Sequence, residues 1–147
     1  MSKKTQTAEV FVKLLIGAGK ASPSPPVGPA LGARGVKSMD FCKQFNDKTK
    51  HIVADTPLPT VITIKSDRSF TFIVKSPPTT YFLKKAAGIT KGAQTPGTEV
   101  AGQVSLKHVY EIAKIKQQDV NLKHLSLESI TSSIIGVAKS VGIQVVH

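Results

Sequence analysis

The sequence predicts an α+β protein of two small domains, and three observations support this prediction. The first half contains apolar and β-branched runs around one short amphipathic helix, whereas the second half contains apolar residues at helical spacing. A Ser-Pro-Pro sequence separates the two patterns, and consecutive prolines continue neither a strand nor a helix. We therefore expect an N-terminal α/β domain at residues 1–75, a stiff linker at 76–78 and a compact, three-helix C-terminal domain at 79–147.

Three strands are expected in the N-terminal half. Apolar and β-branched residues indicate strands over residues 8–16, 61–65 and 70–74. Residues 66–69, Ser-Asp-Arg-Ser, are suited to a hairpin turn between the last two. Apolar residues alternate along the third strand, so one face of a short sheet is expected to pack on a helix.

That helix is expected to begin at Ser38, a suitable N-cap, and to end near Lys48. Its apolar face consists of Met39, Phe41, Cys42 and Phe45. The segment before it, Pro23–Gly35, has the sequence PSPPVGPALGARG. Proline lacks the backbone donor and fixes φ, so this segment predicts a rigid, exposed loop that is neither a helix nor an inner strand. Rigid exposed loops are common recognition sites.

The C-terminal half predicts three helices. Thr79, Ser105 and Ser126 are suitable N-caps, while Gly88 and Gly142 are suitable C-terminal stops for the first and third helices. The glycine-rich segment 89–102 predicts a long, mobile loop. A short strand at residues 143–146 completes the expected domain.

The charge balance favours a polyanionic partner. Lys and Arg number 20 against 9 Asp and Glu, a net charge of +11. The excess occurs in both halves, so nucleic acid is the favoured partner and a merely solubilising surface is the alternative. Binding of this kind weakens steeply with salt.

Other features exclude several classes of protein. No apolar run approaches the roughly 18 residues that a membrane span needs. The first ten residues, MSKKTQTAEV, are basic but lack the apolar core of a secretory signal. Cys42 is the only cysteine, which excludes an internal disulfide and a cysteine metal cluster. The four histidines are scattered without partners at ligand or catalytic spacing, so we expect no enzyme, metal, cofactor or small-molecule substrate.

Gly136 indicates a candidate binding surface. It lies inside the third predicted helix, where Gly costs about 1 kcal/mol relative to Ala. Two explanations remain open, namely tight packing against another helix or close approach of a partner backbone. The same face carries small hydroxyls and one cation, groups that suit ribose and phosphate: Ser132, Ser133, Lys139 and Ser140.

Three blocks of sequence carry a resemblance to a known family. They are PSPPVGPALGARGVKSMDFCKQFN (23–46), DRSFTFIVKSPPTTYFLKKAAGI (67–89) and SIIGVAKSVGIQVV (133–146). In this order and spacing they resemble the ribosomal protein L11 family of the large ribosomal subunit. The resemblance implies a non-catalytic protein that binds large-subunit rRNA at the GTPase-associated centre, at the base of the stalk. Its implied partners besides rRNA are stalk ribosomal proteins and translational GTPases.

The resemblance also implies individual contact residues. In the family, rRNA contacts fall on the third-helix motif and the neighbouring loops, which match Gly136, Lys139, Ser140 and Gly142, with Asn121, Lys84, Lys85, Gly88, Thr90, Gly102 and Ser105 as secondary candidates. The family's proline loop faces the rRNA and forms one wall of the thiopeptide antibiotic site, and it matches Pro23, Pro25, Pro26 and Pro29. The N-terminal domain that carries this loop contacts elongation factors and stalk components in the family.

The lysine excess and residues 105–117, SLKHVYEIAKIKQ, are similar to the mitochondrial branch of the family. The implied location is the mitochondrial matrix, in the mitochondrial ribosome, with a bacterial cytoplasm or a plastid as the alternative. The alternative function is a free helical DNA- or RNA-binding regulatory module. The third helix offers Ser, Gly and Lys instead of the Arg, Asn and Gln that usually contact bases, which disfavours that alternative.

Overall fold

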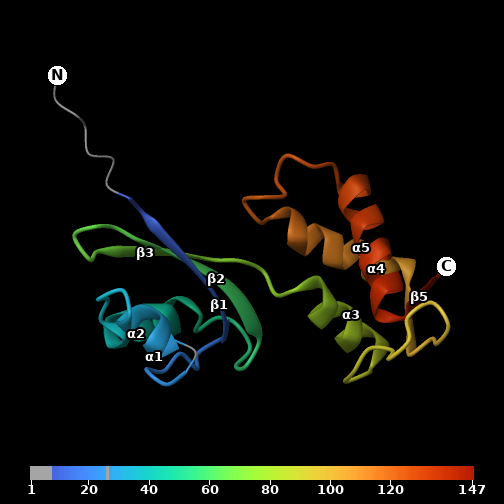
Figure 1. Ribbon diagram of the computed structural model, residues 1–147. Helices are drawn as coiled ribbons and strands as arrows, with labels where there is room; N and C mark the ends of the chain where they lie inside the picture. The colour runs from blue at the N-terminus through green and yellow to red at the C-terminus, as the bar shows by residue number, and fades with distance from the viewer. Residues whose placement is uncertain (1–7, 26) are drawn as a thin grey trace. The chain divides into compact units, whose positions relative to one another are not determined.

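The computed structural model describes residues 8–25 and 27–147. The chain divides into two compact units, of which the first ends at Lys75 and the second runs from Ser76 to His147 (Figure 1). Each unit has its own hydrophobic core.

The first unit contains a three-stranded antiparallel sheet in the order β1-β2-β3, with β1 at Val10–Gly17, β2 at Pro57–Ile64 and β3 at Phe70–Val74. The three predicted strands are confirmed, but β2 begins four residues earlier than expected. Its added residues include Pro57 and Pro59, which pair with β1, whereas pairing with β3 begins only at Thr60. Proline is tolerated there because a strand with one neighbour needs fewer backbone donors.

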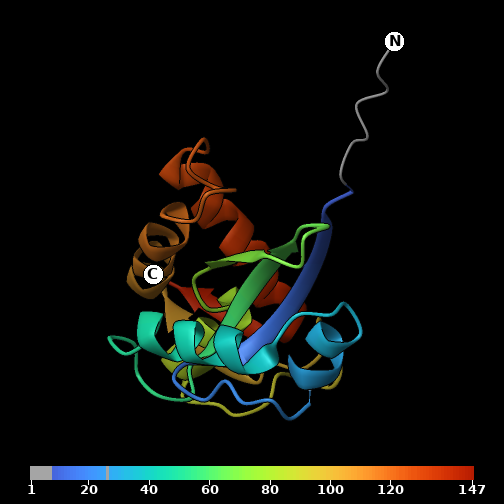
Figure 2. The ribbon, with the colours of Figure 1, turned by 90° about the vertical axis from the view of Figure 1, so that its left-hand side faces the viewer.

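Two helices cover one face of this sheet, α1 at Val27–Gly32 and α2 at Ser38–Lys48 (Figures 1 and 2). The expectation that the proline-rich segment contains no helix is therefore wrong. Pro29 is the third residue of α1, within the first turn, where a backbone N–H has no intrahelical acceptor and its absence costs nothing. Val27 and Leu31 are buried and attach α1 to the core.

Helix α2 differs from the prediction in two details. Lys37 is its N-cap and makes no side-chain cap bond, so Ser38 is the first helical residue and not the cap. Met39 is 61% exposed and does not belong to the apolar face. Phe41 and Phe45 are fully buried, and Phe72 of β3 lies edge-on to Phe41 with 5.2 Å between ring centroids.

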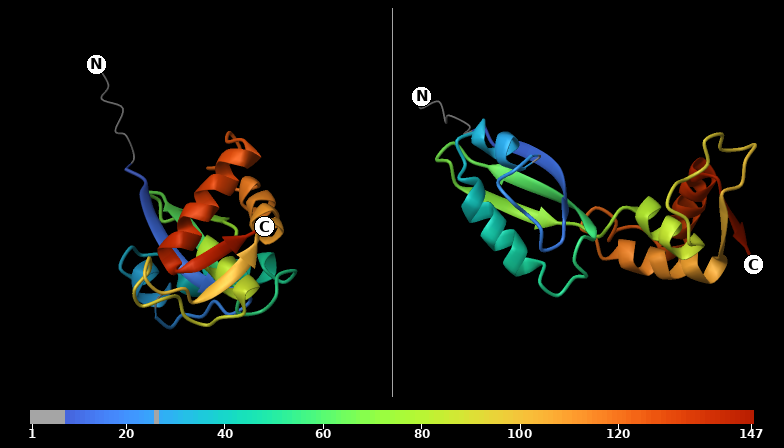
Figure 3. Two further views of the ribbon diagram at one scale, coloured as in Figure 1. Left: turned by 90° about the vertical axis from the view of Figure 1, so that its right-hand side faces the viewer. Right: turned by 90° about the horizontal axis from the view of Figure 1, so that it is seen from below.

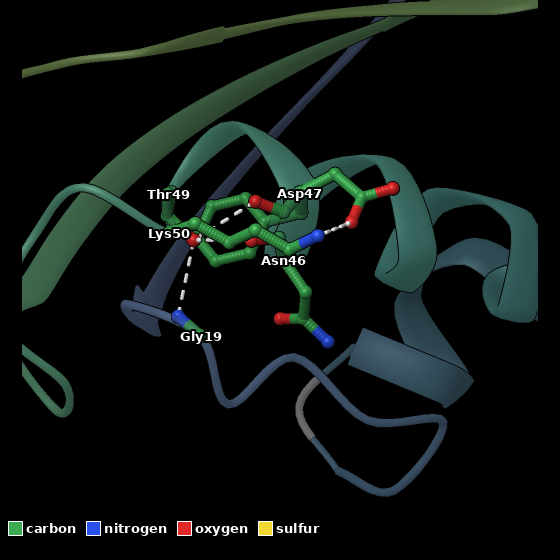
Figure 4. Close-up of polar contacts among 6 residues, drawn as sticks. Gly19, Asn46, Asp47, Thr49 and Lys50 are labelled. Carbon is green, nitrogen blue, oxygen red and sulfur yellow. Dashed lines mark hydrogen bonds and ion pairs between the residues drawn. The ribbon is translucent and has the colours of Figure 1, made fainter.

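The loop after β1 is attached to the end of α2 (Figure 4). The Gly19 N–H donates to Thr49 Oγ1 at 3.0 Å, and Thr49 Oγ1 in turn donates to the Phe45 carbonyl at 2.9 Å. The side chain of Asn46 accepts from the Ala21 N–H at 3.0 Å and donates to the Ala21 carbonyl at 3.2 Å. These bonds fix the chain just before the proline-rich segment.

The second unit contains three helices, α3 at Thr79–Ala87, α4 at Leu106–Gln117 and α5 at Leu127–Val141. It also contains two parallel strands, β4 at Gly102–Ser105 and β5 at Ile143–Val146, which Figure 3 shows side by side. The strand at 143–146 was expected, whereas β4 lies partly in the segment predicted to be loop. Four residues are too few for a clear alternating pattern in the sequence, and the partner strand that stabilises β4 lies about 40 residues away.

The helix ends agree with the prediction except at α3. Ser105 and Ser126 accept hydrogen bonds from backbone N–H groups in the first turns of α4 and α5, as expected of N-caps. Gly88 and Gly142 end α3 and α5 with φ of 71° and 80°, which confirms both stops. Pro78 is the N-cap of α3, so Thr79 is the first helical residue instead of its cap.

Candidate nucleic-acid interface

Helix α5 has one buried face and one exposed face. Ile130, Ile134 and Ala138 are buried in the core of the second unit. The opposite face carries the small polar residues and the single lysine singled out in the sequence, and all of them are exposed: Ser132, Ser133, Gly136, Lys139 and Ser140. We call these five residues the α5 strip.

The surroundings of Gly136 exclude one of its two explanations, tight packing against another helix. A Cβ atom built on Gly136 meets no heavy atom within 4 Å. No helix of the unit therefore packs against this position, and internal packing does not require a glycine. The glycine costs about 1 kcal/mol of helix stability and has open space around it, so close approach of a partner backbone is the explanation that remains.

The hydroxyls of the strip lie close to the helix. Ser133 Oγ donates to the Ser129 carbonyl at 3.0 Å, and Ser140 Oγ donates to the Val137 carbonyl at 2.6 Å. Their protons are thus used within the helix, while their lone pairs remain available to an outside donor such as a ribose 2′-hydroxyl. Lys139 supplies the positive charge in the last turn of α5.

The glycine-rich loop between α3 and β4 is held against the C-terminal end of α5. The Ala93 N–H donates to the Val141 carbonyl at 2.9 Å, and the Ala101 N–H donates to the Gly142 carbonyl at 2.8 Å. Both ends of the predicted mobile loop are therefore attached by backbone bonds. Thr90 and Lys91, both exposed, lie within three residues of the first attachment.

Two of the predicted contact glycines have structural roles. Gly142 is buried, and a Cβ there would overlap the Cβ of Ala93. A Cβ on Gly102 would lie 3.1 Å from the Cβ of Ala87, where β4 packs on α3. Both glycines allow close packing, of the glycine-rich loop against the end of α5 at Gly142 and of β4 against α3 at Gly102. Their role in the structure is therefore packing beneath the exposed residues of the candidate surface.

The end of α3 brings three further candidates to the start of the glycine-rich loop. Gly88 is exposed and has open space at its Cβ position, so its left-handed φ alone explains the glycine. The Ile89 N–H donates to the Lys84 carbonyl at 3.0 Å, which closes the helix end. Lys85 is exposed, with its Nζ 5.7 Å from the ring centroid of Tyr81.

Asn121 lies beyond the other end of α5, in the turn that follows α4, and it is exposed. Leu122 and Leu125 of the same turn line a cavity of about 80 Å³ together with Ser133 and Val137 of α5. The turn thus packs beside the α5 strip. At 1.5 Å per residue, the 15 residues of α5 span about 22 Å between the two loop regions.

Asp119 holds this turn and was not identified from the sequence. Its carboxylate accepts from Ser76 N at 3.0 Å and from Ser76 Oγ at 2.7 Å, and it lies 3.3 Å from Lys116 Nζ. Only 12% of its side chain is exposed. The i,i+3 spacing of Lys116 and Asp119 was a usable signal, but nothing in the sequence links Asp119 to Ser76, 43 residues earlier.

Ser105 is occupied as a helix cap. Its Oγ accepts from the His108 N–H at 3.4 Å and lies 3.0 Å from His108 Nδ1. The half-buried hydroxyl therefore has a structural role at the end of β4, three residues beyond Gly102.

The second unit presents most of its cations unpaired. It contains eight lysines and four acidic residues. Among the described residues only Lys114 and Lys116 make ion pairs in this unit, with Glu111 and Asp119. The exposed lysines of the candidate surface thus keep their charge available to an anion.

The proline-rich segment forms a separate candidate surface on the first unit. Pro23, Pro25 and Pro29 are exposed, and Pro26 lies outside the described residues. A Cβ on Gly28 would overlap the Pro23 carbonyl oxygen, so the first turn of α1 lies close against Pro23. Of this segment, residues 27–32 form the short helix α1, on which Pro29 is exposed.

Within the described residues, no three His, Cys, Asp or Glu side chains are placed to hold a metal ion. Among the helices of residues 8–25 and 27–147, none combines the length and the apolar composition that a membrane span requires. Burial raises the pKa of the Cys42 thiol, which makes it a poor nucleophile.

A helical unit with an exposed strip of small polar residues and unpaired lysines has the features of an RNA-binding domain. A family model described as "Ribosomal protein L11, RNA binding domain" matches residues 75–145, and one described as "Ribosomal protein L11, N-terminal domain" matches residues 12–70. The large ribosomal subunit protein uL11m of Schizosaccharomyces pombe is 49% identical over 140 residues, which cover 95% of this chain and 97% of that protein. The chain belongs to the ribosomal protein L11 family, whose members are structural ribosomal proteins and not enzymes.

Proposed function

We propose that the second unit anchors this protein to large-subunit rRNA at the GTPase-associated centre, at the base of the ribosomal stalk. The first unit, with its proline-rich segment, faces translation factors and stalk proteins. The observation that carries the rRNA assignment is the open space above Gly136 in the middle of an exposed cationic strip.

The proposed contact is a backbone contact along a groove. With no side chain at Gly136 and short hydroxyls beside it, α5 approaches a sugar–phosphate surface closely. Lys139 and the lysines at the end of α3 neutralise phosphates on either side of that line of contact. The loop held at Val141 and the turn held by Asp119 extend the surface beyond the two ends of α5.

Such a protein supports the elongation step of translation by positioning rRNA and translation factors, without chemistry of its own. Its rRNA contacts hold a folded segment of RNA in place, and the first unit supplies a surface for translation factors. Translational GTPases then meet an ordered surface, and no group of this chain takes part in GTP hydrolysis.

We place the protein in the mitochondrial ribosome, in the matrix. Residues 105–117 resemble the mitochondrial branch of the family, and the relative uL11m is almost half identical to this chain. Fractionation of cells that express the tagged protein tests this. Co-sedimentation with the large subunits of mitochondrial ribosomes supports it, whereas co-sedimentation with bacterial or plastid subunits assigns the alternative location.

Binding to a transcript of the GTPase-associated segment of large-subunit rRNA tests the anchor. We expect residues 76–147 to retain most of the affinity of the full chain and residues 1–75 to retain little. Starting the fragment at Ser76 keeps the two bonds to Asp119. The affinity should fall steeply with salt, and duplex DNA should compete poorly. Equal affinity of the two fragments would reject the anchor assignment.

A further inference from the structure

The sheet of the first unit has a second face on which large apolar side chains are exposed to solvent. Helices α1 and α2 lie on one side of the sheet (Figures 1 and 2), where Val12, Ile16 and Ile62 are buried. The alternate positions point to the other side. There Phe11 is 61% exposed, Leu15 56% and Ile73 54%.

The strand register places these residues in neighbouring rows. Phe11 is opposite Thr63, and Leu15 is opposite Pro59. Between them, Val61 lies opposite Lys13 on one side and Ile73 on the other. An antiparallel sheet with one face in water normally alternates apolar and polar residues, and an extended exposed apolar patch usually marks an interaction site. We call Phe11, Lys13, Leu15, Val61 and Ile73 the outer sheet face.

The positive charge of this face indicates that its partner carries negative charge. Lys13 lies in the middle row of this face. Lys65 and Lys75, which directly follow β2 and β3, occupy alternate positions on the same side of the sheet. Within the described part of the chain, the one acidic residue at such a position is Glu9, just before β1. Among the described residues, none of these three lysines makes an ion pair.

We propose that the outer sheet face binds an amphipathic α-helix of another protein at the ribosome. The helix has apolar residues at positions i, i+3 or i+4, and i+7, with Asp or Glu beside them to meet Lys13. This inference rests on the proposed function, because it takes the chain to be mounted on the large subunit by its other unit. A helix fits because its apolar stripe covers several rows of a sheet at once.

Other occupants suit this face less well. An RNA backbone would find few donors around Phe11, Leu15 and Ile73. A second copy in a two-fold dimer would bring the same lysines together, and like charges placed opposite each other are destabilising. Both occupants, and an anionic membrane surface, are outcomes of the test below.

The test uses large subunits that carry the full-length protein with a photo-crosslinking phenylalanine analogue at position 11. The matched control has the analogue at Lys43, which is exposed on α2, on the helical side of the unit. Purified stalk proteins and a purified elongation GTPase with a non-hydrolysable GTP analogue are added in separate arms. We expect cross-links from position 11, and few from position 43, to an apolar helix with acidic flanks in one of these arms.

Two substitutions then measure the contact. Leu15→Ser should weaken binding of the cross-linked protein about 30-fold, as loss of a central interface residue does. Lys13→Glu should weaken it as well, and replacing the facing acid of the partner by lysine should restore it.

Several results would overturn the inference. These are cross-links to rRNA or to a second copy, binding of the free chain to cardiolipin vesicles that Leu15→Ser abolishes, or no cross-link in either arm. Release of the Leu15→Ser chain from the subunit would also reject it, because the face would then serve attachment or folding. Failure of the wild-type chain to join the subunit rejects the proposed function and this inference with it, whereas normal assembly without a helix cross-link rejects this inference alone.

Discussion

Replacing Gly136 tests whether the gap in the α5 strip serves a partner or the protein itself. Gly inside a helix is about 1 kcal/mol less favourable than Ala, and Leu is nearly as good as Ala. Because Gly136 is exposed and no heavy atom lies within 4 Å of the Cβ position, the added Cβ meets no clash that would offset this gain. Gly136→Ala and Gly136→Leu should therefore each raise the free energy of unfolding of the second unit by about 1 kcal/mol.

The same substitutions should lower the affinity for rRNA. A methyl group forced into a closely packed contact costs about 1–3 kcal/mol, so Gly136→Ala should weaken binding roughly tenfold. The Leu side chain is too large for a small adjustment, and Gly136→Leu should abolish measurable binding. Stability and affinity thus change in opposite directions.

Native-state hydrogen exchange of the α5 amides in the full chain measures the stability, and titration with the rRNA transcript measures the affinity. Glu111→Leu is the matched control because it places the same side chain on an exposed position of α4, away from the strip. Unchanged affinity of Gly136→Leu would refute the close-approach explanation. Weaker binding together with faster hydrogen exchange would instead show that the substitution damages the fold.

Three further predictions concern the supports of the two units. Asp119→Ala leaves the Ser76 N–H and the Lys116 ammonium without their carboxylate, so the free energy of unfolding, measured by thermal unfolding, should fall by about 2–3 kcal/mol. An unchanged free energy of unfolding would mean that water replaces the carboxylate. Gly142→Ala places a side chain at φ 80° against Ala93, which should cost at least about 1–2 kcal/mol and speed exchange of the Ala93 and Ala101 amides. Cys42, buried with a raised pKa, should react with iodoacetamide near pH 8 far more slowly than an unfolded chain does, and equal rates would contradict its burial.

The regular elements were largely predictable because each depends on local chemistry. The alternating pattern of residues 70–74 predicted the bounds of β3 correctly. Helix starts were predictable from the N-caps Ser105 and Ser126, and helix ends from the left-handed glycines Gly88 and Gly142. Prediction failed where a long-range contact decided the outcome. Helix α1 forms despite Pro29 because Val27 and Leu31 reach the core, and β4 forms because β5 lies beside it.

The candidate surface was predictable in composition but not in the role of each residue. Ser132, Ser133, Lys139 and Ser140 lie on one exposed face, as helical periodicity predicts. Their support was not predictable, because Asp119 depends on a partner 43 residues away and the loop 89–102 depends on backbone bonds to Val141 and Gly142.

By itself, the sequence determined that this protein has two small units, a strong positive charge and a glycine-interrupted amphipathic helix near its end. Only the tertiary structure separated two glycines that look alike in the sequence. Gly142 is buried against Ala93 and completes the fold, whereas Gly136 has nothing beside it. The reason is physical: a sequence specifies the backbone freedom of a glycine, but the space around it is set by residues that folding brings there from elsewhere in the chain.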